Sequence, residues 1–271
     1  QEVREYDHVR SGLIEAGVEH CALSLSGSRW TEIPAGAIAA LRYVLFHGVG
    51  ILHCRSYIPA LMGLVAARLT RARLLFDMRG LFVDEYLFEG ALREGTLKLA
   101  FVRWLERLLI ARSDAIVVVS ERFKEHLVNR PDLAGTVDPE KITVIPNRVD
   151  LSRSRAASAG RDGVRARMGW EDCTVAVYSG SVARWHMLDL MMKTMVRAME
   201  ELPGLRFLVL TYPDSRGARE AARAAGVAPE KIRFETAGPT DVPRLLAAAD
   251  LGLLYVRPHV SKEVCAPIKF A

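Results

Sequence analysis

Short apolar runs alternate with segments of helical periodicity along the first half of the chain. The apolar runs, which we expect to form strands, fall at residues 18–25, 50–54, 73–76, 115–120 and 142–146. Apolar residues at helical spacing predict helices over residues 2–16, 36–47, 57–69, 94–112 and 121–130. Near-continuous apolar strands that alternate with helices are typical of a parallel sheet covered on both faces.

The same alternation resumes in the second half. Strands are predicted at residues 174–180, 205–211, 231–235 and 250–256, and helices at 186–201, 215–225 and 241–248. Between the halves, residues 151–167 are rich in Ser, Ala and Arg, which favours a linker. We therefore expect an α/β protein of two Rossmann-like lobes with parallel sheets: residues 1–150, the linker 151–167, and a partial second lobe over 168–271. Both ends fall inside predicted helices, so we expect further residues before Gln1 and after Ala271.

The net charge of +5 is concentrated in the predicted linker. Residues 151–167 hold five arginines against one acidic residue, Asp162. Arginines there can contact an anionic lipid or a nucleotide, or form a solvated connector. No aromatic residues are interleaved with them, so the sequence does not favour nucleic-acid binding.

Other features exclude several common classes of protein. Four widely spaced cysteines without a CxxC pair favour reduced thiols over a zinc or redox site. No Walker loop, HExxH motif or Ser-His-Asp order is present. The charged opening segment is unlike a secretory signal, and no apolar run is long enough to cross a membrane. We expect a cytoplasmic protein, and peripheral contact with the inner face of a membrane stays an open alternative.

The end of the strand at 174–180 carries the first candidate site. Ser179-Gly180-Ser181 forms a glycine turn before a helix, where a backbone and free N–H groups can approach a phosphate. Arg184 and a protonated His186 can add charge-assisted hydrogen bonds. The alternative is a turn that only connects two elements.

The end of the strand at 73–76 carries the second candidate site. Asp77 and Arg79 supply a carboxylate and a guanidinium that can orient a sugar or a phosphate, or close a loop by an internal salt bridge. The segment 81–94 is long for a loop and carries Asp84 and Glu85, so we expect a mobile acceptor-binding loop. Arg55, at the end of the preceding strand, is a further acceptor-binding candidate.

Two helix faces have structural interpretations. Methionines at 187, 191, 195 and 199 recur every four residues, which predicts a helix face packed on a sheet. The helix at 94–112 combines apolar and basic residues, and we expect a core face with its basic side chains extended around it. A helix lying on a membrane is the alternative. The residues concerned are Phe101, Trp104, Leu105, Leu108 and Leu109, with Lys98, Arg103, Arg107 and Arg112.

Taken in order, these motifs suggest a family. A strand, Ile145-Pro146-Asn147-x-Val149-Asp150, a linker, a strand, Ser179-Gly180 and Pro267-x-Lys269 follow one another. This order resembles the family-four retaining glycosyltransferases of the GT-B fold, which use nucleotide-diphosphate sugars as donors. The resemblance implies an acceptor-binding first lobe and a donor-binding second lobe. It implies no metal or other cofactor, and a leaving diphosphate stabilised by cations and helix dipoles. Front-face attack, the usual explanation of retention, needs no enzyme nucleophile.

The resemblance also implies roles for individual residues. It places the donor diphosphate at Gly180, the base near the ends of two later strands, and the sugar near residues 263–269. Asp77 and Arg79 shape the catalytic site together with Glu263. The donor-binding set is Ser179, Gly180, Ser181, Arg184, His186, Thr211, Tyr212, Glu235, Ala237, Pro267 and Lys269, and the acceptor-binding set is Arg55, Asp84 and Glu85.

The sequence departs from the family pattern in several places. Arg148 stands where the family has a glycine, Ser181 replaces a basic residue, and Phe76-Asp77 stands where a histidine is common. We expect a transferase of surface polysaccharide or lipid-linked glycan synthesis, acting on a glycan or lipid-linked acceptor. The alternatives are a nucleotide-sugar epimerase, a non-catalytic scaffold that binds sugar nucleotides, and a two-lobed receptor for small ligands.

Overall fold

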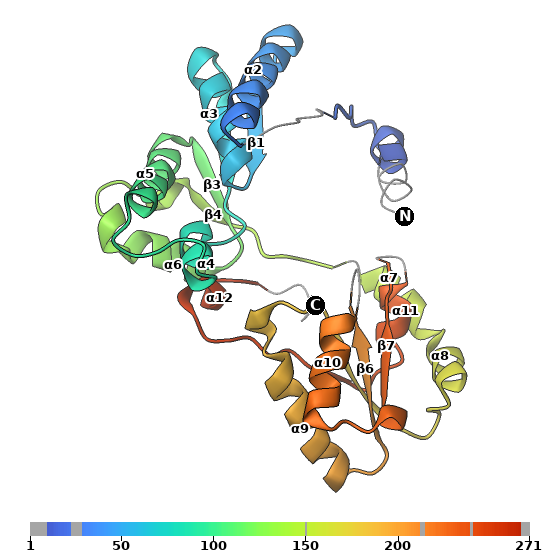
Figure 1. The fold of residues 1–271 in the computed structure, drawn as a ribbon. Coiled ribbons are helices and arrows are strands. Elements are labelled where there is room, and N and C mark those ends of the chain that lie inside the picture. Colours follow the sequence, from blue (N-terminus) through green and yellow to red (C-terminus); the bar gives the residue numbers. More distant parts are fainter. Residues whose placement is uncertain (1–9, 23–28, 150, 212–214, 239–240, 267–271) are drawn as a thin grey trace. The chain divides into compact units, whose positions relative to one another are not determined.

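The computed structural model describes residues 10–22, 29–149, 151–211, 215–238 and 241–266 (Figure 1). The chain divides into two compact units, Gln1–Ile145 and Pro146–Ala271. Within the described ranges, each unit has a four-stranded sheet in which all strand pairs are parallel. All four cysteines are free thiols. The α/β class and the parallel sheets expected from the sequence are therefore confirmed.

The sheet of the first unit has the strand order β1-β2-β3-β4. Its strands are β1 (Ile51–Arg55), β2 (Arg73–Asp77), β3 (Ala115–Val118) and β4 (Ile142–Val144). The helices are α2 (Arg29–His47), α3 (Tyr57–Leu69), α4 (Phe82–Phe88), α5 (Leu97–Arg112) and α6 (Glu121–Asn129). Short 3₁₀ turns, η1 (Pro131–Leu133) and η2 (Pro139–Lys141), connect α6 to β4.

Apolar strand residues form the centre of this unit. Leu74, Phe76, Ile116 and Val118 are at most 1% exposed, which explains why their runs are apolar in sequence. Side-chain caps fix where two helices begin. The hydroxyl of Thr96 accepts a hydrogen bond from the backbone N–H of Leu99, and Ser120 does the same for Phe123.

Three expectations for the first unit are wrong or only partly testable. Residues 18–22 form no strand, although one was predicted over 18–25, because they pair with no strand of the described sheet and leave β1 as its edge. Residues 23–25 lie outside the described residues, as do residues 2–9 of the first predicted helix; residues 10–15 are helical. The segment 81–94 is no open loop, since α4 occupies half of it and buries Val83 in a cluster with Leu92 and Leu99.

The second unit has the strand order β7-β6-β5-β8. Its strands are β5 (Thr174–Ser179), β6 (Leu205–Leu210), β7 (Ile232–Glu235) and the short β8 (Leu251–Gly252). Its helices are α7 (Leu151–Ser158), α8 (Arg161–Met168), α9 (Leu188–Glu201), α10 (Arg216–Ala225), α11 (Val242–Leu246) and α12 (Val260–Glu263). Two 3₁₀ turns, η3 (Arg184–His186) and η4 (Pro229–Lys231), complete it.

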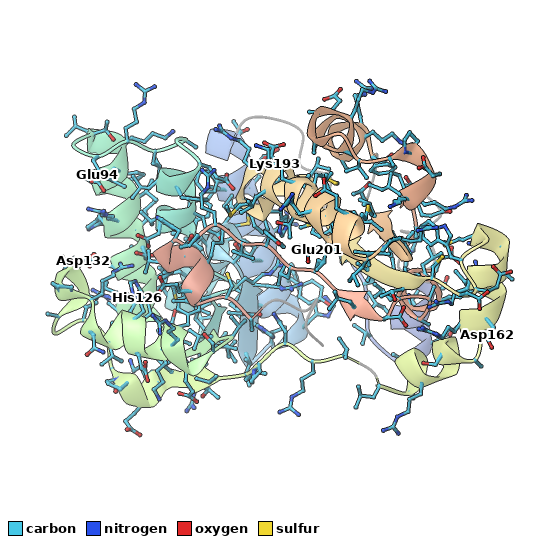
Figure 2. The ribbon with its side chains drawn as sticks, turned by 90° about the horizontal axis from the view of Figure 1, so that it is seen from below. Glu94, His126, Asp132, Asp162, Lys193 and Glu201 are labelled. Atoms are coloured by element: carbon cyan, nitrogen blue, oxygen red, sulfur yellow. The ribbon has the colours of Figure 1, made fainter. Side chains whose placement is uncertain are left out.

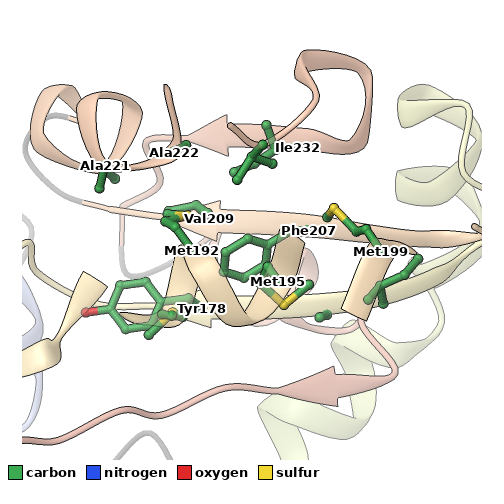
Figure 3. Packing of buried hydrophobic residues seen from close by; sticks show 14 residues of the cluster. Tyr178, Met192, Met195, Met199, Phe207, Val209, Ala221, Ala222 and Ile232 are labelled. Carbon is green, nitrogen blue, oxygen red and sulfur yellow. The ribbon is translucent and has the colours of Figure 1, made fainter. Parts of the chain in front are cut away.

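Alternating strand residues divide the core of this unit into two layers. Tyr178, Phe207 and Val209 face a cluster with the methionines of α9 and the alanines of α10 (Figure 3). Their neighbours Val177, Leu208 and Leu210 face the opposite cluster, with α8 and α11. The predicted methionine face is confirmed for Met191, Met195 and Met199, which are at most 5% exposed.

Residues 151–167 were predicted to form a linker, but they are mostly helical and pack within the second unit. They form α7 and α8, and α8 buries Val164 and Met168 beside Trp170 and β5. Two of their arginines are bound within the same unit. Arg161 donates to the carbonyl oxygens of Ala247 and Ala249, and Arg165 donates to that of Ala248. These side chains therefore contribute to the fold rather than to a solvated segment.

The expected core face of the helix at 94–112 is wrong for its aromatic residues. Helix α5 buries Leu99, Leu109 and Ile110, whereas Phe101 is 49% and Trp104 55% exposed. The inner face also contains Glu106, which is fully buried. The helix therefore has apolar residues on both its inner and its outer face.

Candidate functional site

The segment that follows β5 is fixed by two hydrogen bonds. The backbone N–H of Gly180 donates to the carbonyl of Leu210 at 2.9 Å and so extends the β5–β6 pairing by one residue. The hydroxyl of Tyr178 donates to the carbonyl of Ser181 at 2.6 Å. Burial raises the pKa of Tyr178, so this hydroxyl stays protonated and keeps donating. The glycine turn predicted from the sequence is thus held in one conformation.

A cavity of about 370 Å³ opens beside this segment, at the beginning of α9. Its walls are formed by residues 182–184, residues 187–190, the first turns of α10, and Arg257. Met187, which precedes α9, has a left-handed backbone (φ 49°), and within the described part of the chain it makes no side-chain capping hydrogen bond to the helix. The N-terminal end of a 14-residue helix therefore forms part of the cavity wall.

Among the described residues, two guanidinium groups and one carboxylate line the cavity. The cations belong to Arg184, in η3, and to Arg257, which follows β8; the carboxylate belongs to Asp189. The backbone N–H of Arg257 donates to the carbonyl of Trp185 at 2.9 Å, which fastens the two cationic segments to each other. Two cations beside a helix N-terminus favour an anionic ligand such as a phosphate.

His186 lies beneath the cavity wall. Its side chain is buried, with its ring 5.7 Å from that of Tyr178 and 3.8 Å from that of Trp185. It is not among the residues that line the cavity. The structure therefore brings Arg184 to the cavity and places His186 in the packing that supports it.

Two further donor-binding candidates meet at the ends of neighbouring strands. Thr211 follows β6 and Glu235 ends β7, and the backbone N–H of Thr211 donates to the carbonyl of Glu235 at 3.1 Å. Thr211 is buried, and within the described part of the chain its hydroxyl has no hydrogen-bond partner. Ala237 packs at the edge of the α8 and α11 cluster. Tyr212 lies outside the described residues.

The last described segment holds the remaining candidate of this unit. Glu263 ends α12 and is exposed. Next to it, the ammonium group of Lys262 lies 4.4 Å from the centre of the Trp185 ring, a cation–π contact that ties α12 to η3. Pro267 and Lys269 lie outside the described residues.

In the first unit, the candidates gather at the ends of β1 and β2. The Asp77 carboxylate lies 3.4 Å from Nε2 of His53, and its backbone carbonyl accepts the N–H of Ser56 at 2.9 Å. Arg55 and Arg79 are exposed at the same strand ends. Carboxylate, imidazole and guanidinium groups therefore share one edge of the sheet.

The two acidic acceptor-binding candidates have different surroundings. The carboxylate of Glu85 lies beside Gly80, since a Cβ atom added to that glycine would be 3.4 Å from its nearer oxygen. Asp84 instead faces Arg130, whose guanidinium lies 3.9 Å away. Asp84 is thus part of an ion-pair network of the fold.

This network was not predicted from the sequence. Glu106 is fully buried and accepts hydrogen bonds from the hydroxyl of Tyr57, at 2.7 Å, and from the guanidinium of Arg130. Arg130 also pairs with Asp132, which is labelled in Figure 2. Arg257 was missed too, although it follows a predicted strand and the rule that strand ends carry function would have included it.

The described residues contain no group of three His, Cys, Asp or Glu side chains arranged to hold a metal ion. In the same part of the chain, each helix is too short or too polar to cross a bilayer.

Solved structures with this fold include sugar-nucleotide enzymes. A glycosyltransferase from Rickettsia africae matches with a TM-score of 0.65 and 16% identity over 89% of this chain and 60% of that one. Anabaena HepE in complex with UDP-glucose matches with 0.64 and 12% identity, over 90% and 62%. A Listeria monocytogenes protein assigned as a UDP-N-acetylglucosamine 2-epimerase matches with 0.57 and 14% identity, over 89% and 62%. The two parallel-sheet units are the Rossmann-like lobes of the GT-B fold.

The chain thus spans about three fifths of the length of these structures. A comparison with curated proteins gave no match. The sequence profile named Glycosyltransferase Family 4 matches residues 7–153, which is more than half of the 271 residues. The chain belongs to this family of glycosyltransferases.

Proposed function

We propose that this protein transfers a hexosyl group from a nucleotide-diphosphate sugar to a glycan or lipid-linked acceptor, with retention of configuration. The setting that fits this chemistry is the synthesis of surface polysaccharide or of a lipid-linked glycan, on the cytoplasmic side of a membrane. The observation that supports it is the cavity at the beginning of α9, where Arg184 and Arg257 face the uncapped end of the helix. Such a site stabilises a diphosphate, and most strongly one that gains charge as it leaves.

The other candidates of the second unit are assigned around this diphosphate site. In this assignment the backbone of residues 179–181 approaches the diphosphate. The buried ring of His186 packs against Trp185 and so fixes the position of η3. Thr211, Tyr212, Glu235 and Ala237 surround the base, and Glu263, Pro267 and Lys269 surround the sugar. HepE, which has this fold, is known with UDP-glucose bound.

In the first unit, Asp77 and Arg79 act on the acceptor at the ends of β1 and β2. The neighbouring imidazole of His53 orients the Asp77 carboxylate. Arg55 and Glu85 contact the acceptor, whereas Asp84 has a structural role through Arg130. In this proposal no metal and no other cofactor takes part in the reaction, and residues 1–150 bind the acceptor while 168–271 bind the donor.

The first experiment is calorimetric titration with UDP, GDP and ADP, each without added metal. Arg184→Ala and Arg257→Ala should each weaken binding of the preferred nucleotide by about 1.5–3 kcal/mol, a loss of roughly tenfold or more. Arg197→Ala is the matched control, because Arg197 lies on α9 but its guanidinium is 78% exposed and pairs with Glu200. No binding of any nucleotide, or equal affinity in all three variants, would contradict the proposal.

A nucleotide-sugar epimerase is the second candidate, favoured by the shared fold of the Listeria protein. It would convert a nucleotide sugar without any acceptor. A scaffold would instead bind the nucleotide sugar without turnover. Incubation of the preferred donor with and without an acceptor extract distinguishes the three, because a transferase releases nucleotide diphosphate in proportion to acceptor.

A further inference from the structure

The outer face of α5 carries a continuous row of large apolar side chains. Leu97, Phe101, Trp104 and Leu108 are spaced four, three and four residues apart, so they follow one another along one side of the helix. Leu97 is 91%, Phe101 49% and Trp104 55% exposed. The rings of Phe101 and Trp104 stack with their centroids 5.8 Å apart, which joins them into one surface. We call these four residues the α5 outer row.

Basic residues border this row along both sides. At the angular spacing of an α-helix, Lys98 and Arg112 fall on one side of the row, and Arg107 falls on the other. Arg68 of α3 adds a guanidinium at the C-terminal end, because it donates to the carbonyl of Arg112 at 3.2 Å. The outer face is therefore apolar along its middle and cationic along its edges.

Acidic residues contribute little to this face. The one acidic residue within α5 is Glu106, and it is buried on the inner face with Tyr57 and Arg130. Glu94, which precedes the helix and is labelled in Figure 2, pairs with Arg103 at 3.3 Å. Lys98, Arg107 and Arg112 are exposed. The charge that the helix presents outward is thus positive.

We propose that the α5 outer row docks onto an anionic phospholipid surface, with α5 lying in the plane of the interface. Aromatic rings and leucines enter the boundary between headgroups and acyl chains, while lysine and arginine side chains extend to the phosphates. At 1.5 Å per residue, the 16 residues of α5 cover roughly 24 Å of that surface. This proposal stands independently of the reaction, since it needs only this face of the first unit.

The charges favour a lipid surface over a second copy of the same chain. Two copies meeting through this face would bring the same rows of lysine and arginine against each other, and like charges repel. A bilayer that contains phosphatidylglycerol offers the opposite sign. Exposed aromatic residues beside arginines are also the composition of helices that lie at membrane interfaces.

The test is co-sedimentation of the purified protein with vesicles of phosphatidylglycerol and phosphatidylcholine, compared with vesicles of phosphatidylcholine alone. The protein should bind the anionic vesicles, and binding should weaken as salt rises from about 50 mM to about 500 mM. The Phe101→Ser/Trp104→Ser variant should bind roughly tenfold more weakly. Lys98→Gln/Arg107→Gln should weaken binding roughly thirtyfold at low salt, because the two basic residues contribute about 1 kcal/mol each near an anionic surface.

Leu202→Ser is the matched control, since Leu202 is 57% exposed and lies at the end of α9 rather than on α5. It should bind vesicles like the unchanged protein. All of these residues are at the surface, and unchanged circular dichroism will show that each variant is folded. Vesicle binding that is absent, insensitive to salt, or equal in all variants overturns the proposal. Light scattering that finds a dimer, dissociated by the aromatic double substitution, assigns the row to a second copy instead.

Discussion

The side-chain amide of Asn147 donates a hydrogen bond of 2.7 Å to the backbone carbonyl of Ala266, across 119 positions of sequence. Asn147 belongs to the Pro146–Asp150 motif, at the beginning of the second unit. Ala266 is the last described residue of the segment that begins at α12. One polar residue of the motif therefore holds the segment to which we assign the donor sugar.

Replacing Asn147 with Ala should loosen that segment without unfolding the unit. The side chain is exposed, so the loss of one hydrogen bond should lower the free energy of unfolding by about 1 kcal/mol. Hydrogen exchange of the backbone amides in residues 260–266 should become faster. Arg148→Ala, at the next exposed position, should leave this exchange unchanged. Equal exchange in both variants would show that the hydrogen bond does not restrain the segment.

Ser56 has a backbone conformation that suits glycine. Its φ of 75° and ψ of 172° lie in a backbone region that residues other than glycine rarely adopt. This conformation costs about 1–3 kcal/mol of folding free energy. Its N–H nevertheless donates to the carbonyl of Asp77, so the strained residue holds the end of β2. Ser56→Gly should raise the free energy of unfolding by about 1 kcal/mol after the entropy cost of glycine.

Urea denaturation measures this difference, and Ser56→Ala is the control. Alanine keeps the strain, and the serine side chain makes no capping hydrogen bond that could be lost. The alanine variant should therefore match the unchanged protein to within about 0.5 kcal/mol. A glycine variant that is no more stable than the alanine variant would show that the site is unstrained.

The hydroxyl of Tyr57 supports the buried carboxylate of Glu106. Tyr57→Phe would leave one oxygen of that carboxylate without this donor, at an expected cost of about 1–3 kcal/mol. Burial, followed by the Glu106 carboxylate, raises the pKa of Tyr57 well above its ordinary value. A group whose pKa is raised in the folded state stabilises the fold at pH values below its pKa in the unfolded state. The contribution of Tyr57 to stability is therefore lost as pH rises above about 10.

The Tyr57→Phe variant should therefore be less stable at pH 8 and show a weaker decline in stability above pH 10. Thermal unfolding across this pH range measures both effects. Tyr86→Phe is the control, because Tyr86 is a partly buried residue of α4 whose ring packs against Phe82 outside the Glu106 network. Parallel pH profiles for the two variants would contradict the assigned role of Tyr57.

The sequence predicted most of the strands because each is a run of apolar residues that the sheet buries. Thr174–Ser179 and Leu205–Leu210 are such runs, and their alternate residues face two separate layers. It could not show which face of α5 is covered, since both faces carry apolar residues. Glu106, the one acidic residue of that helix, lies on the covered side, where Arg130 reaches it from 24 positions away.

The same limit explains the predicted linker. Residues 151–167 are rich in arginine, which predicted a solvated linker. The partner that stabilises Arg161 and Arg165 within the fold is Asp250, which lies 89 and 85 positions later and could not be recognised from the sequence. The sequence indicated candidate site residues through the ends of its predicted strands. They placed Arg184 near the cavity and Thr211 beside Glu235, but they gave no sign that His186 is buried.

Asp250 joins the former linker to the sheet, and its charge should make the second unit sensitive to acid. Its carboxylate accepts the backbone N–H of Val175 at 2.8 Å and pairs with Arg161 and Arg165. The Val175 hydrogen bond first, and then the two guanidiniums, lower the pKa of Asp250. A group whose pKa is lowered in the folded state stabilises the fold at pH values above its pKa in the unfolded state. This stabilisation is lost as pH falls through its pKa in the folded state.

Unfolding of the unchanged protein should therefore become easier as pH falls from about 5 to about 3, and Asp250→Asn should weaken this dependence. The asparagine variant should be the less stable of the two at pH 7, because Arg165 is buried and loses its ionic partner. Asp241→Asn is the control, since that side chain is 58% exposed and lies 3.7 Å from Arg244. If Asp241→Asn changes the acid profile as much as Asp250→Asn does, general charge repulsion rather than the Asp250 cluster causes the acid sensitivity.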